Sequence, residues 1–209
     1  MHSLPVGTGA LEAAFFAPLE AWPFAAALVS TGVVALAEIG DKTQLLALML
    51  AARFRRPGAI VAGILVATLL NHALAAWLGA WVAAWLRPEV LKWLVAGSFA
   101  AVALWSLKPD TLDEADSVPA RSAFVATLFA FFLAEIGDKT QVATVLLATR
   151  YEPLWEVVFG TTVGMLLANV PVVLLGARFA RRLPLKAARR VAAAVFLALA
   201  VWVAFNGAG

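Results

Sequence analysis

A stretch of nine residues, LAEIGDKTQ, occurs twice in this chain, at residues 36–44 and 133–141. Each copy lies near the centre of a long apolar stretch and brings one Glu, one Asp and one Lys into it. An ionisable side chain at the centre of a bilayer costs at least about 2.5 to 3.5 kcal/mol, and such residues mark functional sites by default. The repeated motif is therefore the first candidate for a functional site.

The composition places the chain in a membrane. Of its 209 residues, 63% are hydrophobic and 14% are charged, whereas about 25% of the residues in an average soluble domain are charged. Cysteine is absent, which excludes disulfides and thiolate metal sites and leaves oxygen or imidazole ligands for any metal. The net charge of +3 comes from basic residues in short loops beside apolar runs, a pattern typical of membrane proteins, so we expect no nucleic-acid partner.

The apolar runs predict an all-α integral membrane protein with six transmembrane helices, because most of them can cross about 30 Å of hydrocarbon. The predicted spans cover approximately residues 24–50, 59–86, 90–107, 122–148, 157–177 and 191–205. Residues 1–23 contain no Lys or Arg, unlike a cleaved signal peptide, and we expect them to form an exposed tail. Residues 108–121 are rich in acidic side chains and contain two prolines, which predicts a solvated loop between two halves.

The two halves, residues 24–107 and 122–209, align at a constant offset of 97 residues. The offset extends beyond the motif, since it pairs Gly63 with Gly160 and Trp105 with Trp202. This indicates a duplication. Because each half has an odd number of spans, the second half must enter the membrane from the opposite side. The sequence therefore predicts two inverted three-helix repeats, an architecture found mostly in transporters.

The basic residues outside the motifs predict the orientation. The side that holds the connections after the first, third and fifth spans carries Arg53, Arg55, Arg56, Lys108, Arg121, Arg178, Arg181, Arg182, Lys186, Arg189 and Arg190. The other side carries Arg87, Lys92 and Arg150. The first side should be cytoplasmic, which places the acidic loop in the cytoplasm and both termini, including the 1–23 tail, outside it.

Each motif, read as part of one continuous helix, presents a polar face. At about 100° per residue, the side chains of Glu38, Asp41 and Lys42 lie on the same side. Two such faces can meet near the middle of the bilayer. A lysine in this position should pair with a carboxylate, and Glu38 with Lys42 has the i to i+4 spacing of a helical ion pair. We expect Gly40 and Gly137 to permit close helix approach.

The residue types of the motif suit a hard divalent cation. The predicted ligands are four carboxylates, with hydroxyl, amide and lysine groups as accessory site residues: Glu38, Asp41, Glu135 and Asp138, with Lys42, Thr43, Gln44, Lys139, Thr140 and Gln141. Such oxygen ligands fit calcium, manganese or magnesium, and the lysines balance part of the negative charge. An empty site would take up protons, and a metal would displace them. The plain alternative is a pair of Glu–Lys bridges that only fix helix register.

Two further polar residues, His72 and Asn169, lie in the second span of each half and align under the 97-residue offset. They are candidate accessory ligands, or His72 a proton carrier. An interhelical hydrogen-bonded contact without a role in transport is at least as good an interpretation.

A doubled Glu-x-Gly-Asp-Lys-Thr motif in a six-span chain resembles the Golgi-type divalent-cation transporter family, over about residues 24–207. That family includes Golgi manganese/calcium transporters and bacterial manganese exporters, and the short tail and loop of this chain are similar to those of the compact bacterial members. The resemblance implies exchange of manganese or calcium for protons. It also implies that the first and fourth spans carry the site, with Glu38, Asp41, Glu135 and Asp138 as cation-binding acids.

The leading prediction is a secondary transporter in the cell (inner) membrane, a multi-pass protein that exports manganese(II), or calcium(II), in exchange for protons. Its partners would be the metal ion, protons and the lipid bilayer, and a homo-oligomer is compatible with the sequence. We predict neither enzymatic activity nor a bound cofactor, because paired acids without a nucleophile constellation are poor evidence for an intramembrane enzyme. A passive cation channel and a six-helix exporter of a small organic solute remain as alternatives.

Overall fold

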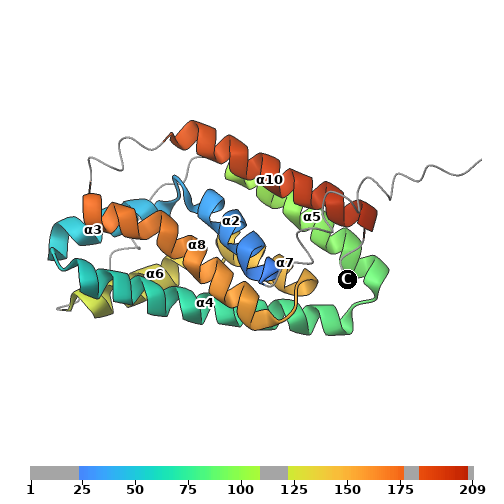
Figure 1. Ribbon diagram of the computed structural model, residues 1–209, viewed down its shortest axis with the longest axis horizontal. Coiled ribbons are helices and arrows are strands. Elements are labelled where there is room, and N and C mark those ends of the chain that lie inside the picture. The colour runs from blue at the N-terminus through green and yellow to red at the C-terminus, as the bar shows by residue number, and fades with distance from the viewer. Residues whose placement is uncertain (1–23, 109–121, 177–183, 207–209) are drawn as a thin grey trace, which may run out of the picture.

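The chain folds into a bundle of helices that run mostly along the long axis of the molecule (Figure 1). The computed structural model describes residues 24–108, 122–176 and 184–206. In these ranges the helices are α2 (Ala25–Glu38), α3 (Lys42–Phe54), α4 (Pro57–Trp85), α5 (Pro88–Ser106), α6 (Ala123–Glu135), α7 (Lys139–Arg150), α8 (Leu154–Leu175) and α10 (Leu185–Asn206). The predicted tail at 1–23 and the loop at 108–121, apart from its first residue, lie outside the described residues.

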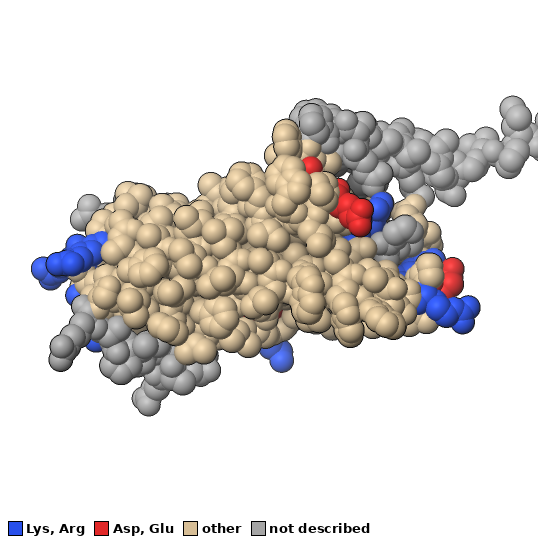
Figure 2. All heavy atoms as spheres, turned by 90° about the horizontal axis from the view of Figure 1, so that it is seen from below, with Lys and Arg blue, Asp and Glu red and all other residues tan. Residues whose placement is uncertain are grey.

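The described helices form an integral membrane protein. Four of them, α4, α5, α8 and α10, are long and apolar enough to cross a membrane, and α2 and α6 are shorter apolar helices. Large apolar side chains point outward from the bundle, as Leu104 and Phe205 do with 70% and 77% of their surface exposed. Figure 2 shows a wide belt with few charged side chains, and most Lys and Arg near its two ends. Hydrocarbon, not water, suits such a surface.

The first and fourth predicted spans are each broken into two helices, so the prediction of continuous helices at 24–50 and 122–148 was wrong. One break separates α2 from α3 and the other separates α6 from α7. At the breaks Gly40 and Gly137 have φ values of +85° and +73°. Glycine is the residue that adopts positive φ at little cost, and an Asp directly after it begins the next helix as its N-cap. The two glycines therefore break the helix. The predicted close approach is absent at Gly137, whose Cβ position has no atom of the described residues within 4 Å, whereas the side chain of Leu185 lies 3.1 Å from the Cβ position of Gly40.

Close approach between helices depends on other glycines. A Cβ added to Gly160 would lie 2.3 Å from the carbonyl oxygen of Ala27, and one added to Gly79 would lie 2.3 Å from that of Val145. These contacts bring α8 against α2 and α4 against α7. Small residues at such crossings let the two backbones approach, as is common in membrane bundles.

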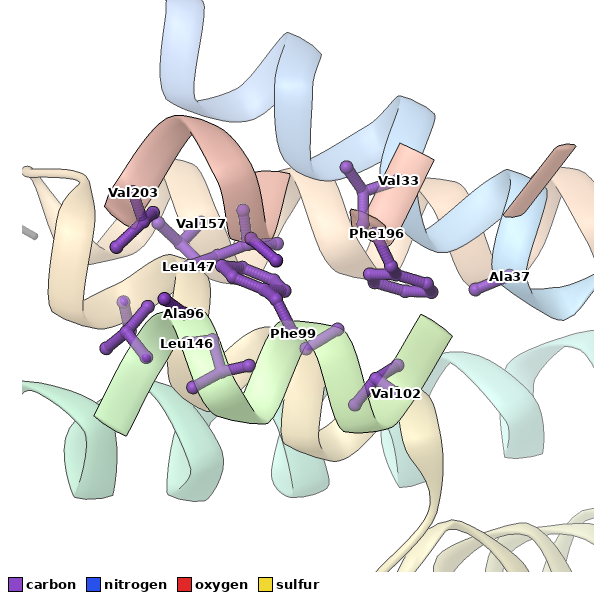
Figure 3. Close-up of a cluster of buried hydrophobic side chains, with 14 of the residues drawn as sticks. Val33, Ala37, Ala96, Phe99, Val102, Leu146, Leu147, Val157, Phe196 and Val203 are labelled. Atoms are coloured by element: carbon purple, nitrogen blue, oxygen red, sulfur yellow. The ribbon is translucent and has the colours of Figure 1, made fainter. Parts of the chain in front are cut away.

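The helices pair in a way that follows the sequence offset. α2 packs along α8, and α6, the counterpart of α2, packs along α4, the counterpart of α8. α4 also packs on α8, and α5 packs on its own counterpart α10. Phe99 and Phe196, which are separated by the same 97 residues, stack between α5 and α10 with ring centroids 6.2 Å apart. Figure 3 shows this pair in an apolar cluster with residues of α2 and α7.

The predicted span boundaries differ most at the last helix. The sequence predicted its start near residue 191, after a basic turn, whereas α10 begins at Leu185 and includes Lys186, Arg189 and Arg190. Lys and Arg are good helix formers, and their long side chains can reach the membrane surface from a helix end. The basic residues therefore mark where the apolar run begins, whereas α10 begins before that run.

Candidate cation site

The two nonapeptides fold into equivalent turns. The backbone N–H of Asp41 donates to the carbonyl oxygen of Glu38 at 3.0 Å, and the N–H of Asp138 donates to that of Glu135 at 3.1 Å. Each turn leaves a glycine N–H without a helical acceptor, and a backbone donor of this kind needs another partner. Glutamine side chains that follow each glycine in the motif supply these partners.

The glutamines of the motif stabilise the two breaks. The side-chain oxygen of Gln44 accepts from the N–H of Gly40 at 2.8 Å, and that of Gln141 accepts from Gly137 at 2.7 Å. Gln44 also donates to the carbonyl oxygen of Ala168 in α8 at 2.9 Å. The predicted accessory residues Gln44 and Gln141 thus stabilise the turns through their amide oxygens.

The threonines connect the two sides of each break. The hydroxyl of Thr43 donates to Oε2 of Glu38 at 2.5 Å, and that of Thr140 donates to Oε2 of Glu135 at 3.1 Å. Each bond joins the first turn of one helix to the last residue of the preceding helix. One oxygen of each glutamate is held in this way, which orients the carboxylate.

Three of the four predicted acids meet between the two breaks. Glu38, Glu135 and Asp138 are buried, and each offers a carboxylate oxygen within 4.8 Å of the others. Oε1 of Glu38 and Oε1 of Glu135 have no hydrogen-bond partner among the described residues. A buried carboxylate oxygen without a donor is costly. A hard divalent cation among these oxygens would supply the missing positive charge and the missing bonds.

Asp41 is bound differently from its counterpart Asp138. Its Oδ1 accepts from the backbone N–H of Lys42 at the start of α3. Its Oδ2 lies 2.6 Å from the ammonium nitrogen of Lys139, which belongs to the other motif. Asp41 is fully buried and Lys139 nearly so. The ion pair therefore joins the two breaks, and Asp41 is not a member of the group formed by the other three acids.

The predicted ion pair between Glu38 and Lys42 was wrong. The i to i+4 spacing brings two side chains together on a continuous helix, and the break at Gly40 removes that geometry. Glu38 instead accepts from Thr43, while the side chain of Lys42 is partly exposed. The described residues contain no ion pair of Lys42.

His72 and Asn169 are buried in α4 and α8, but the structure does not place them in the acid group. Neither ring nitrogen of His72 has a hydrogen-bond partner among the described residues. Asn169 donates to the carbonyl oxygen of Met165 in its own helix at 3.1 Å. Their role as accessory ligands stays a prediction.

Sequence reasoning missed two contacts at the first break. The carbonyl oxygen of Ala168 accepts from Gln44, and the side chain of Leu185 lies 3.1 Å from the Cβ position of Gly40. A backbone oxygen and an apolar leucine carry no signal in a search for polar side chains.

Two comparisons with known proteins found a match. The family model described as "Divalent cation/proton antiporter GDT1" matches residues 26–114 and 123–209. A Vibrio cholerae protein named "Putative manganese exporter" is 56% identical over 178 residues, which cover 85% of this chain and 89% of that protein. No solved structure matches the chain.

Proposed function

Because this chain belongs to the GDT1 divalent cation/proton antiporter family, we propose that it exports manganese(II) from the cytoplasm in exchange for protons. The observation that carries the proposal is the meeting of Glu38, Glu135 and Asp138 from two helix breaks, within 4.8 Å of one another. The Vibrio cholerae relative, named as a manganese exporter, supports manganese as the transported ion. Calcium takes similar oxygen ligands and is the second candidate substrate.

The carboxylates of the site serve both substrates. The metal would bind the carboxylate oxygens of Glu38, Glu135 and Asp138, with Asp41 as the fourth acid of the proposed site. Thr43 and Thr140 would fix the orientation of the two glutamates, as their hydrogen bonds indicate. Protons compete with a metal for the same oxygens, so release of one accompanies binding of the other. This competition is the physical basis of exchange.

The proposed architecture is six membrane crossings in two inverted repeats, residues 24–107 and 122–209. In it α2 with α3, and α6 with α7, form one broken crossing each. The equivalent packing of α2 on α8 and of α6 on α4 supports it, as does the stacking of Phe99 on Phe196. Broken helices near the middle of the membrane are a common way for transporters to build ion sites. The repeats would open the site to the two faces in turn.

The proposed location is the cell (inner) membrane, with both termini on the non-cytoplasmic side. In Figure 1 the α3–α4 turn, the end of α8 and the start of α10 lie toward the left, and the α4–α5 and α7–α8 turns lie toward the right. The described basic residues of this left-hand group, which would face the cytoplasm, are Arg53, Arg55, Arg56, Lys186, Arg189 and Arg190.

The test is manganese flux in liposomes that contain the purified chain. Glu38→Gln and Asp138→Asn should each abolish manganese transport while the protein stays folded. Glu89→Gln, at an exposed acid at the start of α5, is the matched control and should transport as the parent does. Normal flux in either site variant would refute the assignment of the acids.

The same preparation separates the other functions. Saturable manganese flux that moves protons in the opposite direction excludes a passive channel. The family consists of antiporters, which favours transport over acid–base catalysis and favours cations over organic solutes.

A further inference from the structure

The two lysines of the repeated motif occupy different places, although the sequence makes them equivalent. Lys139 is buried, and its ammonium nitrogen lies 2.6 Å from Oδ2 of Asp41. Lys42 is partly exposed and makes no ion pair with the described residues. Two identical nonapeptides thus adopt two different side-chain arrangements in one molecule.

The aspartates of the two motifs also have different contacts. Asp138 lies in the acid group with Glu38 and Glu135, whereas Asp41 contacts Lys139. The ammonium group of Lys139 takes the position beside Asp41 that a metal ion would need. A divalent cation at Asp41 would have to displace this lysine, because two positive charges at one carboxylate repel each other.

The surroundings of the two breaks differ as well. The side chain of Leu185, at the start of α10, lies 3.1 Å from the Cβ position of Gly40. The Cβ position of Gly137 has no atom of the described residues within 4 Å. Among the described residues, α10 contacts the first break, and no residue makes the corresponding contact with the second. Equivalent sequences in unequal surroundings are what one state of an inverted-repeat transporter shows.

We propose, building on the proposed antiport, that Asp138 and Asp41 alternate as metal ligands and that Lys139 and Lys42 alternate as the cation that holds the idle aspartate. In the state described here the metal group is Glu38, Glu135 and Asp138, and Lys139 holds Asp41. In the opposite state the group is Glu38, Glu135 and Asp41, and Lys42 holds Asp138. The two glutamates belong to both groups.

This exchange conserves the buried interactions. The exchange replaces the ion pair of Lys139 with Asp41 by one of Lys42 with Asp138 and keeps a group of three carboxylates, so it need not leave a buried charge unpaired. Lys139 is the first residue of α7 and directly follows Asp138. Lys139 therefore leaves Asp41 when the start of α7 moves relative to α3. Exchange of the metal ligand is thereby coupled to helix movement, with the lysines as positioning residues.

The test uses a single cysteine as a reporter, since the chain contains none. Leu185→Cys, at an exposed position outside the acid group, reports whether α10 covers the first break. Its alkylation by a maleimide is measured in the purified full chain in liposomes. Lys139→Gln removes the ion pair of the described state and should speed alkylation on the order of tenfold, a usual coupling between two states. Lys42→Gln, the matched control, should leave the rate unchanged or lower it.

Lys139→Arg keeps the positive charge and should keep the rate near that of the cysteine parent. Asp41→Asn removes the carboxylate of the same ion pair and should speed alkylation as Lys139→Gln does. If one of these two variants does not fold, the other still tests the proposal. Equal rates in Lys139→Gln and Lys42→Gln would overturn the proposal. Absence of manganese flux in the cysteine-free parent would instead refute the proposed function, which keeps the two failures distinct.

Discussion

Replacing Gly137 by alanine tests whether the motif breaks the helix. Gly137 has φ of +73°, and an added Cβ would meet no atom within 4 Å, so the substitution strains the backbone without a clash. An L-residue in the left-handed region costs roughly 1 to 2 kcal/mol. Gly97, inside α5, also has open space around its Cβ position but has helical φ. Alanine there should gain about 0.5 to 1 kcal/mol of stability. The two variants should therefore differ by about 1.5 to 3 kcal/mol.

The assay is unfolding of the purified chain in mixed detergent micelles, followed by helical circular dichroism. Gly137→Ala should unfold at a lower denaturant fraction than the parent and Gly97→Ala at a higher one. On a continuous helix both substitutions would stabilise the protein, because alanine is the better helix former. Stabilisation by Gly137→Ala would refute the broken helix and, with it, the arrangement of the acids.

Other predictions concern packing, the glutamate and protons. Gly160→Ala places a Cβ 2.3 Å from the carbonyl oxygen of Ala27, whereas ordinary contact begins at 3.4 Å. Because α2 and α8 must then separate, the unfolding assay should show a loss of about 1 to 3 kcal/mol in the free energy of unfolding. Thr43→Val removes the donor to Oε2 of Glu38 and should reduce manganese transport about tenfold, while Thr43→Ser should restore it. Acidifying the side from which manganese is loaded should raise its KM, since protons and metal compete for the same oxygens; a KM independent of pH would contradict this competition.

The sequence predicted the long helices well, because an uninterrupted apolar run leaves few alternatives in a membrane. The predicted span 59–86 corresponds to α4 at Pro57–Trp85, and 90–107 corresponds to α5 at Pro88–Ser106. It also predicted the acids as site residues, since a carboxylate in such a run is costly unless it has a use. The 97-residue offset predicted that two motifs belong together, and three of the acids do meet.

The local conformation of the motif was harder to predict. The hydrophobicity of an apolar run is the same whether the run forms one continuous helix or two half-helices. The Gly-Asp pair of the motif is also a turn signal, and the prediction used the glycine for helix packing alone. A continuous helix would bring Lys42 beside Glu38, whereas the break separates them. The ion pair between Lys139 and Asp41 depends on how the two halves dock, and no spacing within one motif encodes it.

The central claim is that carboxylates from both helix breaks hold one transported ion. The most direct measurement is a structure determined with manganese bound, in which anomalous scattering locates the metal. We expect a single peak at about 2.0 to 2.6 Å from carboxylate oxygens of Glu38, Glu135 and Asp138. A manganese peak away from these three residues, for example beside His72, would contradict it.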